Sequence, residues 1–179
     1  MDVLLKLARA IDRLCDAFGQ LAAFAALAAC FISAGNALIR YGVGVSSNAF
    51  LEIQWYLFAA CVMLGAAQVL RLNEHVRVDL IYGRIPVRAR VWIDILGILL
   101  FLLPVMGFCL ALSWDFFIAK FQSGEMSNDA GGLIRWPAAL LLPLGFALVC
   151  LQAVAELIKR AAWLQGRIEM DLQYERPLQ

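Results

Sequence analysis

Four long stretches with few or no charged residues constrain the fold of this chain more than any other feature. A helix needs about 20 consecutive, mostly apolar residues to cross the hydrocarbon core of a bilayer. Extended to the nearest interfacial residues, these stretches predict membrane-spanning helices at about residues 17–39, 53–71, 92–114 and 136–157. Hydrophobic residues make up 63% of the chain, well above the share typical of soluble domains. We therefore predict an all-α integral membrane protein with a single four-span domain over residues 1–179.

The basic residues are distributed unevenly among the segments that join these spans. Of the 15 lysine and arginine residues, all but Arg40, Lys120 and Arg135 lie before the first span, between the second and third, or after the fourth. Because lysine and arginine accumulate in cytoplasmic loops, we expect both termini and the loop 72–90 in the cytoplasm. The loops 40–51 and 115–135 are then expected outside. The arginines of the cytoplasmic loop suit anionic membrane lipid, and no nucleic-acid partner is expected.

The segment before the first span has the pattern of a short amphipathic helix, suited to the membrane surface or to a partner helix. Its apolar residues step by three and four: Leu4, Leu7, Ile11, Leu14 and Phe18. Within the first span, small residues recur at every fourth position: Ala25, Ala29, Ser33 and Ala37. Small residues let helix backbones approach closely in a membrane. This stripe is therefore predicted to pack against a neighbour, either in this chain or in another.

The only histidine, His75, lies in the loop 72–90 beside Glu74, with Arg77 and Asp79 close by in sequence. Adjacent residues on a helix point about 100° apart, so Glu74 and His75 cannot share a face there. There is no second histidine for a zinc motif, and acid–base catalysis needs groups that converge on one point. We therefore expect a structural element at the cytoplasmic interface. A membrane enzyme that uses Glu74 and His75 is a remote alternative.

The five cysteines are dispersed, and the chain has no CxxC pair. Metal sites need clustered ligands, so we expect the cysteines to be small apolar fillers and the chain to bind no metal or cofactor.

Four carboxylates lie near the ends of the uncharged stretches: Glu52, Asp94, Asp115 and Glu156. An ionisable group deep in the membrane would be a candidate for transport, but none of these four is central. We expect them to cap helices, to form ion pairs at the interface or to contact a partner. A self-sufficient small four-helix carrier or channel is the alternative, and it would normally place a charge nearer the middle of the membrane.

Two motifs carry a resemblance to a known family. The first, "LEIQWYLFAACVMLGAAQVLRLNEHVRVDL", contains these motif residues: Glu52, Trp55, Gly65, Glu74, His75, Arg77, Val78 and Asp79. The second, "GEMSNDAGGLIRWP", contains these: Ser127, Gly131, Gly132, Trp136 and Pro137. Together, and over roughly Leu14 to Arg160, the chain resembles the small membrane subunit of tripartite ATP-independent periplasmic (TRAP) transporters, the DctQ-like family.

This resemblance implies a function without catalysis in the inner membrane of a bacterium or archaeon. In TRAP systems a periplasmic binding protein captures an organic acid, and a large membrane subunit imports it with sodium. The small subunit binds the large one, is thought to widen its scaffold and is expected to help dock the binding protein, here through the loop 115–135. The motif residues would then be structural or contact partners. The matching branch of the family favours 2-oxo or 2-hydroxy acids.

Overall fold

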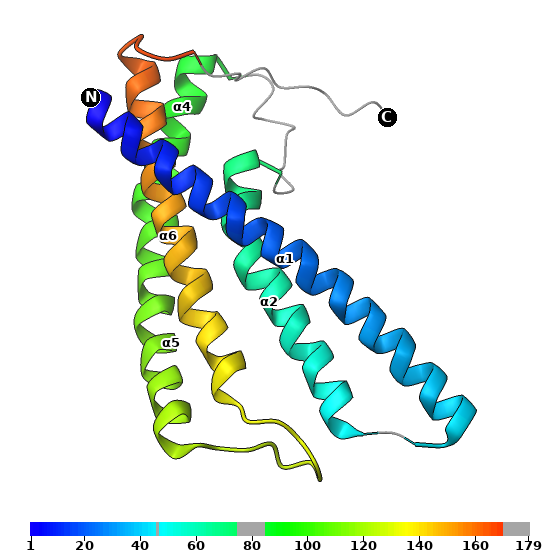
Figure 1. Cartoon of the computed structure of the whole chain (residues 1–179). Helices are drawn as coiled ribbons and strands as arrows, with labels where there is room; N and C mark the ends of the chain where they lie inside the picture. Colours follow the sequence, from blue (N-terminus) through cyan, green and yellow to red (C-terminus); the bar gives the residue numbers. More distant parts are fainter. Residues whose placement is uncertain (46, 75–84, 170–179) are drawn as a thin grey trace.

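The computed structural model describes residues 1–45, 47–74 and 85–169, which form four long helical segments (Figure 1). These segments are α1 (Asp2–Val43), α2 (Asn48–Leu72), the continuous run of α4 (Val87–Gly97), η1 (Ile98–Leu102) and α5 (Leu103–Ser123), and α6 (Trp136–Leu164). By length and composition each can cross a membrane, and each expected span falls inside one of them. The fold is all-α, as the sequence predicts.

The helical bundle has two ends, the loop end and the terminal end. The loop end holds the α1–α2 connection and the residues 124–135 between α5 and α6, called the α5–α6 loop. The terminal end holds the first turns of α1 and the last turns of α6 (Figure 1).

The amphipathic segment and the first span form one uninterrupted helix of 42 residues rather than two helices. At 1.5 Å per residue α1 is about 63 Å long, twice the thickness of a hydrocarbon core of about 30 Å. In Figure 1, α1 crosses α6 near the terminal end and then runs obliquely beside α2 to the loop end. A helix of this length must either tilt strongly or extend beyond the hydrocarbon core.

Helix α6 is the central element, because it contacts α1, α2, α4, η1 and α5. Many of its buried residues are small: Ala139, Gly145, Ala153, Ala155 and Ala162. Small side chains let neighbouring backbones come close, which is how helices associate in a membrane. At Gly145 the approach is close, because a Cβ added there would lie 2.8 Å from the backbone oxygen of Met63 on α2.

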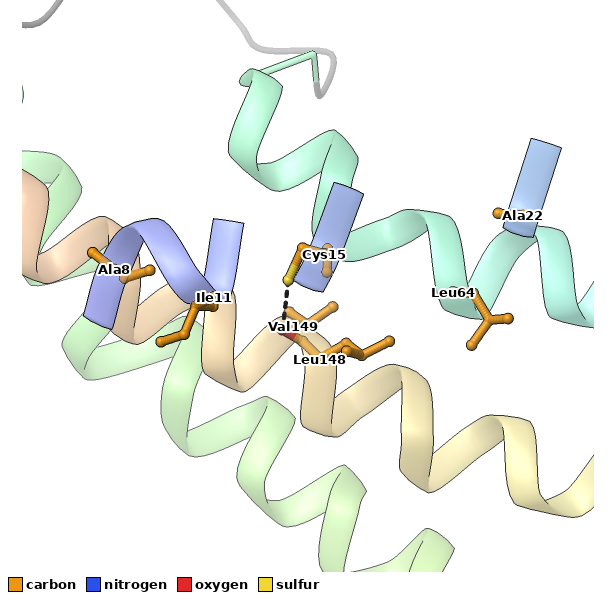
Figure 2. Close-up of a cluster of buried hydrophobic side chains, with 9 residues drawn as sticks. Ala8, Ile11, Cys15, Ala22, Leu64, Leu148 and Val149 are labelled. Atoms are coloured by element: carbon orange, nitrogen blue, oxygen red, sulfur yellow. Dashed lines mark hydrogen bonds between the residues drawn. The ribbon is translucent and has the colours of Figure 1, made fainter. Parts of the chain in front are cut away.

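The packed face of α1 matches the face that its large apolar residues predict only in part, at Ile11 and Phe18, which pack against the core. Leu4, Leu7 and Leu14 are exposed. The buried seam consists mainly of small residues: Ala8, Ile11, Cys15, Gly19 and Ala22. Figure 2 shows part of this seam, with the Cys15 thiol pointing at the backbone oxygen of Leu148 on α6, 4.0 Å away. Close backbone packing favours the small residues, and the bulky leucines are left on the outside.

The predicted stripe on α1 is only partly covered by this chain. Ala25 and Ala29 are half-buried, whereas Ser33 and Ala37 are exposed. The loop-end half of the stripe therefore has no neighbour among the described residues that buries it. Its packing against another chain stays a prediction.

A π-helical turn, η1, ends two residues before Pro104. Proline has no backbone N–H, so it cannot complete the hydrogen bond to the carbonyl four residues earlier. A wider turn at this point is a common response of a helix to such a gap. The sequence predicts a kink at Pro104, and the structure shows this local widening of the helix.

Candidate functional site

The ion pairs of the described residues gather in two clusters, one at each end of the helices. One joins α2 and α5 to the α5–α6 loop, and the other joins α1, α2, α4 and α6. Because charged groups are costly in hydrocarbon, their confinement to the ends agrees with the expected membrane position. These two clusters are the candidate functional features of the chain.

Glu52 is the centre of the loop-end cluster. Because α2 begins at Asn48, Glu52 lies more than a turn inside the helix rather than at its very start. Its carboxylate accepts a hydrogen bond from the hydroxyl of Ser127 and another, 2.6 Å long, from the backbone N–H of Leu133. With only 5% of its surface exposed, Glu52 binds the α5–α6 loop to α2.

Two glycines allow the α5–α6 loop to form the turn that brings Ser127 and Leu133 to Glu52. Gly131 has a φ of 74°, and the N–H of Gly132 donates to the oxygen of Asp129 at 3.0 Å, which closes a tight turn. Positive φ at that position favours glycine. Gly132 is required for a different reason, because a Cβ there would lie 2.4 Å from the Cβ of Ser127 and 2.7 Å from Oε1 of Glu52. The predicted Gly-Gly turn is therefore where the loop meets α2.

Two more side chains of α2 hold the same loop, one turn before and one turn after the glutamate. The side-chain amide of Asn48 donates to the oxygen of Ala130 at 3.0 Å, and the hydroxyl of Tyr56 donates to the oxygen of Ile134 at 3.2 Å. Residues spaced by four lie on one face of a helix. One face of α2 is thus dedicated to anchoring the loop.

Glu125 pairs with two cations at the base of the loop. Its carboxylate binds the ammonium of Lys120 and lies 3.3 Å from Nη1 of Arg135. The hydrogen bond from Lys120, together with the charges of Lys120 and Arg135, lowers the pKa of Glu125 below its ordinary value despite partial desolvation. The carboxylate is therefore ionised at neutral pH, and it holds both cations at the base of the loop.

At the terminal end, two aspartates tie α1 to its neighbours. Asp12 accepts hydrogen bonds from the ammonium of Lys159 at 3.0 Å and from the side-chain amide of Gln152 at 2.9 Å. Asp16 forms an ion pair with Arg71 of α2, with 2.6 Å between the nearest atoms. Both aspartates lie beside the small-residue seam of α1, so the seam and the ion pairs fix the same helix contacts.

Glu156 is the centre of the terminal-end cluster, with 4% of its surface exposed. It accepts a hydrogen bond from Gln152 at 3.1 Å and pairs with Lys159 at 2.6 Å and with Arg160. Arg160 also reaches Asp94 on α4 at 3.2 Å. The cluster thus runs without interruption from α1 through α6 to α4.

The sequence predicts interfacial pairing for Asp94 and Glu156. It does not predict that Asp12 and Asp16 of α1 also form ion pairs at this end. From periodicity, these aspartates belong to the polar side of an amphipathic helix. The overlooked signal is Gln152, a polar residue within an uncharged stretch that is completely buried in the structure. A buried amide N–H₂ group needs acceptors, and the carboxylates of Asp12 and Glu156 provide them, whereas the Oε1 atom of Gln152 has no partner among the described residues.

The histidine motif is largely outside the described residues. Glu74 is exposed and directly follows Asn73, the residue that ends α2 with a positive φ of 60°. His75, Arg77 and Asp79 (with Val78) lie outside the part of the chain that the structure describes. Their expected structural or partner-contact role stays a prediction.

The other motif residues lie where helices meet each other or the surface. Gly65 faces Ala22 of α1, and Trp55 is 69% exposed at the loop end of α2. Trp136 begins α6 and packs edge-to-face against Phe121, with ring centroids 5.6 Å apart. Pro137, the next residue, occupies the first turn, where a missing N–H costs no helical hydrogen bond. Their possible contacts with other proteins stay predictions.

In both clusters, the charged side chains connect helices or loops to one another. Within residues 1–45, 47–74 and 85–169, no group of three histidine, cysteine, aspartate or glutamate side chains is arranged to hold a metal ion. Glu52, Glu125 and Glu156 are each occupied by at least two donors or cations. Such carboxylates brace helices and loops against one another.

Replacing Glu52 with alanine or glutamine is expected to release the α5–α6 loop. Alanine removes both acceptors, and glutamine presents an N–H₂ group where an acceptor is required. Amide hydrogen exchange at Leu133 should become roughly tenfold faster, the effect expected from losing a hydrogen bond to a charged group. Exchange followed by mass spectrometry checks this, with Asp129→Asn as a control on the same loop. Unchanged exchange at Leu133 in both Glu52 variants would contradict this assignment.

Comparisons with known proteins identify the family of this chain. The family model described as "Tripartite ATP-independent periplasmic transporters, DctQ component" matches residues 29–162, well over half of the chain. Neither the curated proteins nor the solved structures gave a match. The family match confirms the resemblance noted from the two motifs. The chain therefore belongs to the DctQ family, the small membrane component of TRAP transporters, which is a family of transporter components and not of enzymes.

Proposed function

We propose that this chain is an accessory scaffold subunit that binds the large membrane subunit of a TRAP transporter. The complex would take up an organic acid together with sodium, after a periplasmic binding protein has delivered it. The observation that supports this role is the position of the charges. Between the two end clusters the four spans carry no aspartate, glutamate, lysine or arginine over residues 17–39, 53–70, 95–114 and 136–155.

Transport of a carboxylate with sodium requires polar ligands within the membrane. Ionisable or polar groups at that depth are expensive and mark ion and substrate pathways. The charged groups of this chain are instead used to clamp helices to each other and to the α5–α6 loop. We infer that the substrate and sodium sites belong to the large subunit, and that this chain supplies a rigid surface against which the large subunit packs.

A co-purification experiment tests this role. The tagged chain, co-expressed with a large TRAP subunit encoded beside it, should elute with that subunit in mild detergent. Organic-acid uptake by proteoliposomes should require both subunits as well as the binding protein. If the two subunits never co-elute, and uptake persists without this chain, the scaffold role is wrong. Saturable, sodium-driven uptake by this chain alone would favour the self-sufficient carrier instead.

The same assay can test the stripe on α1. Ser33→Leu and Ala37→Leu change exposed positions, so the fold of the chain should tolerate them. If the large subunit packs there, the bulkier side chains should reduce its co-elution. Ala111→Leu on an exposed position of α5 is the matched control. Equal yields in all three variants would place the interface elsewhere.

We also propose that the terminal end faces the cytoplasm of a bacterial or archaeal cell and the loop end faces outward, where it can meet the binding protein. The distribution of basic residues supports this orientation. Asn128→Cys should be labelled by a membrane-impermeant thiol reagent added from outside. Asn128 is exposed, whereas the hydroxyl of its neighbour Ser127 donates a hydrogen bond to Glu52. Asn128 is therefore the better position for the cysteine. If the cysteine of the Asn128→Cys variant is labelled only after the membrane has been permeabilised, the chain has the opposite orientation.

A further inference from the structure

We propose that the groove between α2 and α5 holds one phospholipid of the leaflet at the loop end. Its zwitterionic headgroup lies under the α5–α6 loop, and an acyl chain follows α6 toward the middle of the membrane. This assignment does not depend on the partner subunits.

Two cavities share the groove, and both are lined by the same three helical segments. The first, of about 330 Å³, lies at the loop end, and the second, of about 320 Å³, lies deeper along the bundle. One face of α6, with residues spaced by three and four, lines first one cavity and then the other: Ala138, Ala139, Leu142, Gly145, Phe146 and Val149. Residues with that spacing lie on one side of a helix. The two cavities therefore follow one another along the same face of α6, and we infer that they form a single groove.

The length of the groove differs among its three walls. From Ala138 to Val149 it follows α6 for 11 residues, and from Glu52 to Leu70 on α2 and from Leu102 to Lys120 on η1 and α5 it extends over 18 residues. At 1.5 Å per residue these lengths are about 16 Å and about 27 Å. One leaflet with its headgroups is about 20–22 Å thick, which lies within this range.

The polarity along the groove also fits a lipid. The lining of the second cavity is made of apolar side chains and glycine, among them Ala66, Leu70, Leu102 and Met106. The lining of the first cavity is apolar near Leu142 and carries charged side chains beneath the loop. An amphiphile with its headgroup at the loop end matches both parts.

The charges of the first cavity favour a headgroup that carries both signs. Lys120 and Arg135 line it, and Glu125, which binds both, does not. Glu52 also lines it, but its carboxylate accepts hydrogen bonds from Ser127 and Leu133. Glu125 thus positions the two cations and leaves several of their N–H groups available for a phosphate. Asp129 lines the same cavity, and its carboxylate has no partner among the described residues. It can receive the ammonium of the headgroup, so a zwitterion fits better than an anion.

Native mass spectrometry of the full chain, delipidated and titrated with defined lipids, tests this assignment. The probes are phosphatidylethanolamine, phosphatidylcholine and phosphatidylglycerol with identical acyl chains. We expect one tightly bound zwitterionic lipid, with the anionic lipid bound more weakly. Lys120→Gln combined with Arg135→Gln should weaken binding of the zwitterionic lipid about tenfold, the effect expected from losing charge-assisted hydrogen bonds. Arg40→Gln, at an exposed loop-end arginine of α1, is the matched control.

A second variant tests the acyl chain without altering any charge. Ala66→Phe fills the deeper cavity and should also weaken binding, whereas Ala111→Phe on the exposed side of α5 should not. Circular dichroism and elution volume establish that each variant is folded, and the Ala66 comparison stands even if the double variant is not.

Three results would overturn the proposal. The first is preference for phosphatidylglycerol over both zwitterionic lipids, and the second is complete displacement of the lipid by inorganic phosphate. The third is no lipid bound more tightly to the wild type than to the variants, as expected if a side chain of the binding protein occupies the cavity instead.

Discussion

Replacing Glu156 with alanine should lower the free energy of unfolding by about 3 kcal/mol, because removing one member of a buried cluster leaves Lys159 and Arg160 with one carboxylate each instead of two. Glu156 is buried and bound by Gln152, Lys159 and Arg160. We expect the lower end of the usual range, because Lys159 keeps Asp12 as a partner. For a chain of this size the loss corresponds to a fall of roughly 6–12 °C in Tm.

Thermal unfolding in detergent, followed by the fluorescence of the eluting protein, measures this effect. Glu156→Gln should lower the free energy of unfolding by less than Glu156→Ala, because the amide oxygen can still accept a hydrogen bond from Arg160. Asp115→Ala removes a carboxylate from an exposed position of α5 and should change Tm little. A Glu156→Ala variant as stable as the Asp115→Ala variant would show that the terminal-end cluster does not hold the helices together.

Gly145→Ala and Gly107→Ala are expected to change stability in opposite directions. At Gly145 the new Cβ would lie 2.7 Å from Cε of Met63 and 2.8 Å from its backbone oxygen, so α2 and α6 would have to separate. Overpacking of this kind typically costs about 1–3 kcal/mol. At Gly107 on α5 no atom of the described residues, apart from its chain neighbours and the adjoining backbone of the same helix, lies within 4 Å of the added Cβ. Alanine there should stabilise the helix by about 0.5–1 kcal/mol.

The same thermal unfolding assay compares the two glycine variants directly, since the chemical change is identical. A lower Tm for Gly145→Ala together with an equal or higher Tm for Gly107→Ala would support close packing of α2 on α6. Equal effects at both positions would mean that α2 and α6 do not approach each other at this glycine.

The helices and the family could be predicted from the sequence, because both depend on signals that are local in the chain. Long apolar stretches must form helices in a bilayer, since every backbone polar group needs an internal partner there. The Gly-Gly turn and the Trp-Pro start of α6 are likewise properties of neighbouring residues. The structure places each of these features where the sequence predicts it.

The packed face of α1 could not be chosen in the same way. Its large leucines form the more obvious apolar pattern, but in a membrane lipid solvates leucine as well as a neighbouring helix does. Close contact between backbones decides instead, and it selects the seam through Ala8, Cys15 and Gly19. Periodicity of hydrophobic residues therefore identifies the packed face only in part here, because Ile11 and Phe18 pack against the core whereas Leu4, Leu7 and Leu14 are exposed.

The sequence by itself determined that this chain is a four-helix membrane protein with charges only near the ends of its spans. Only the tertiary structure decided which charges meet. Asp12 and Lys159 are 147 positions apart, and Glu52 and Leu133 are 81 apart, yet both pairs are in hydrogen-bond contact. The physical reason is that hydrophobicity acts on each segment separately, whereas an ion pair or a buried hydrogen bond exists only after two segments have been brought to the same depth and turned toward each other.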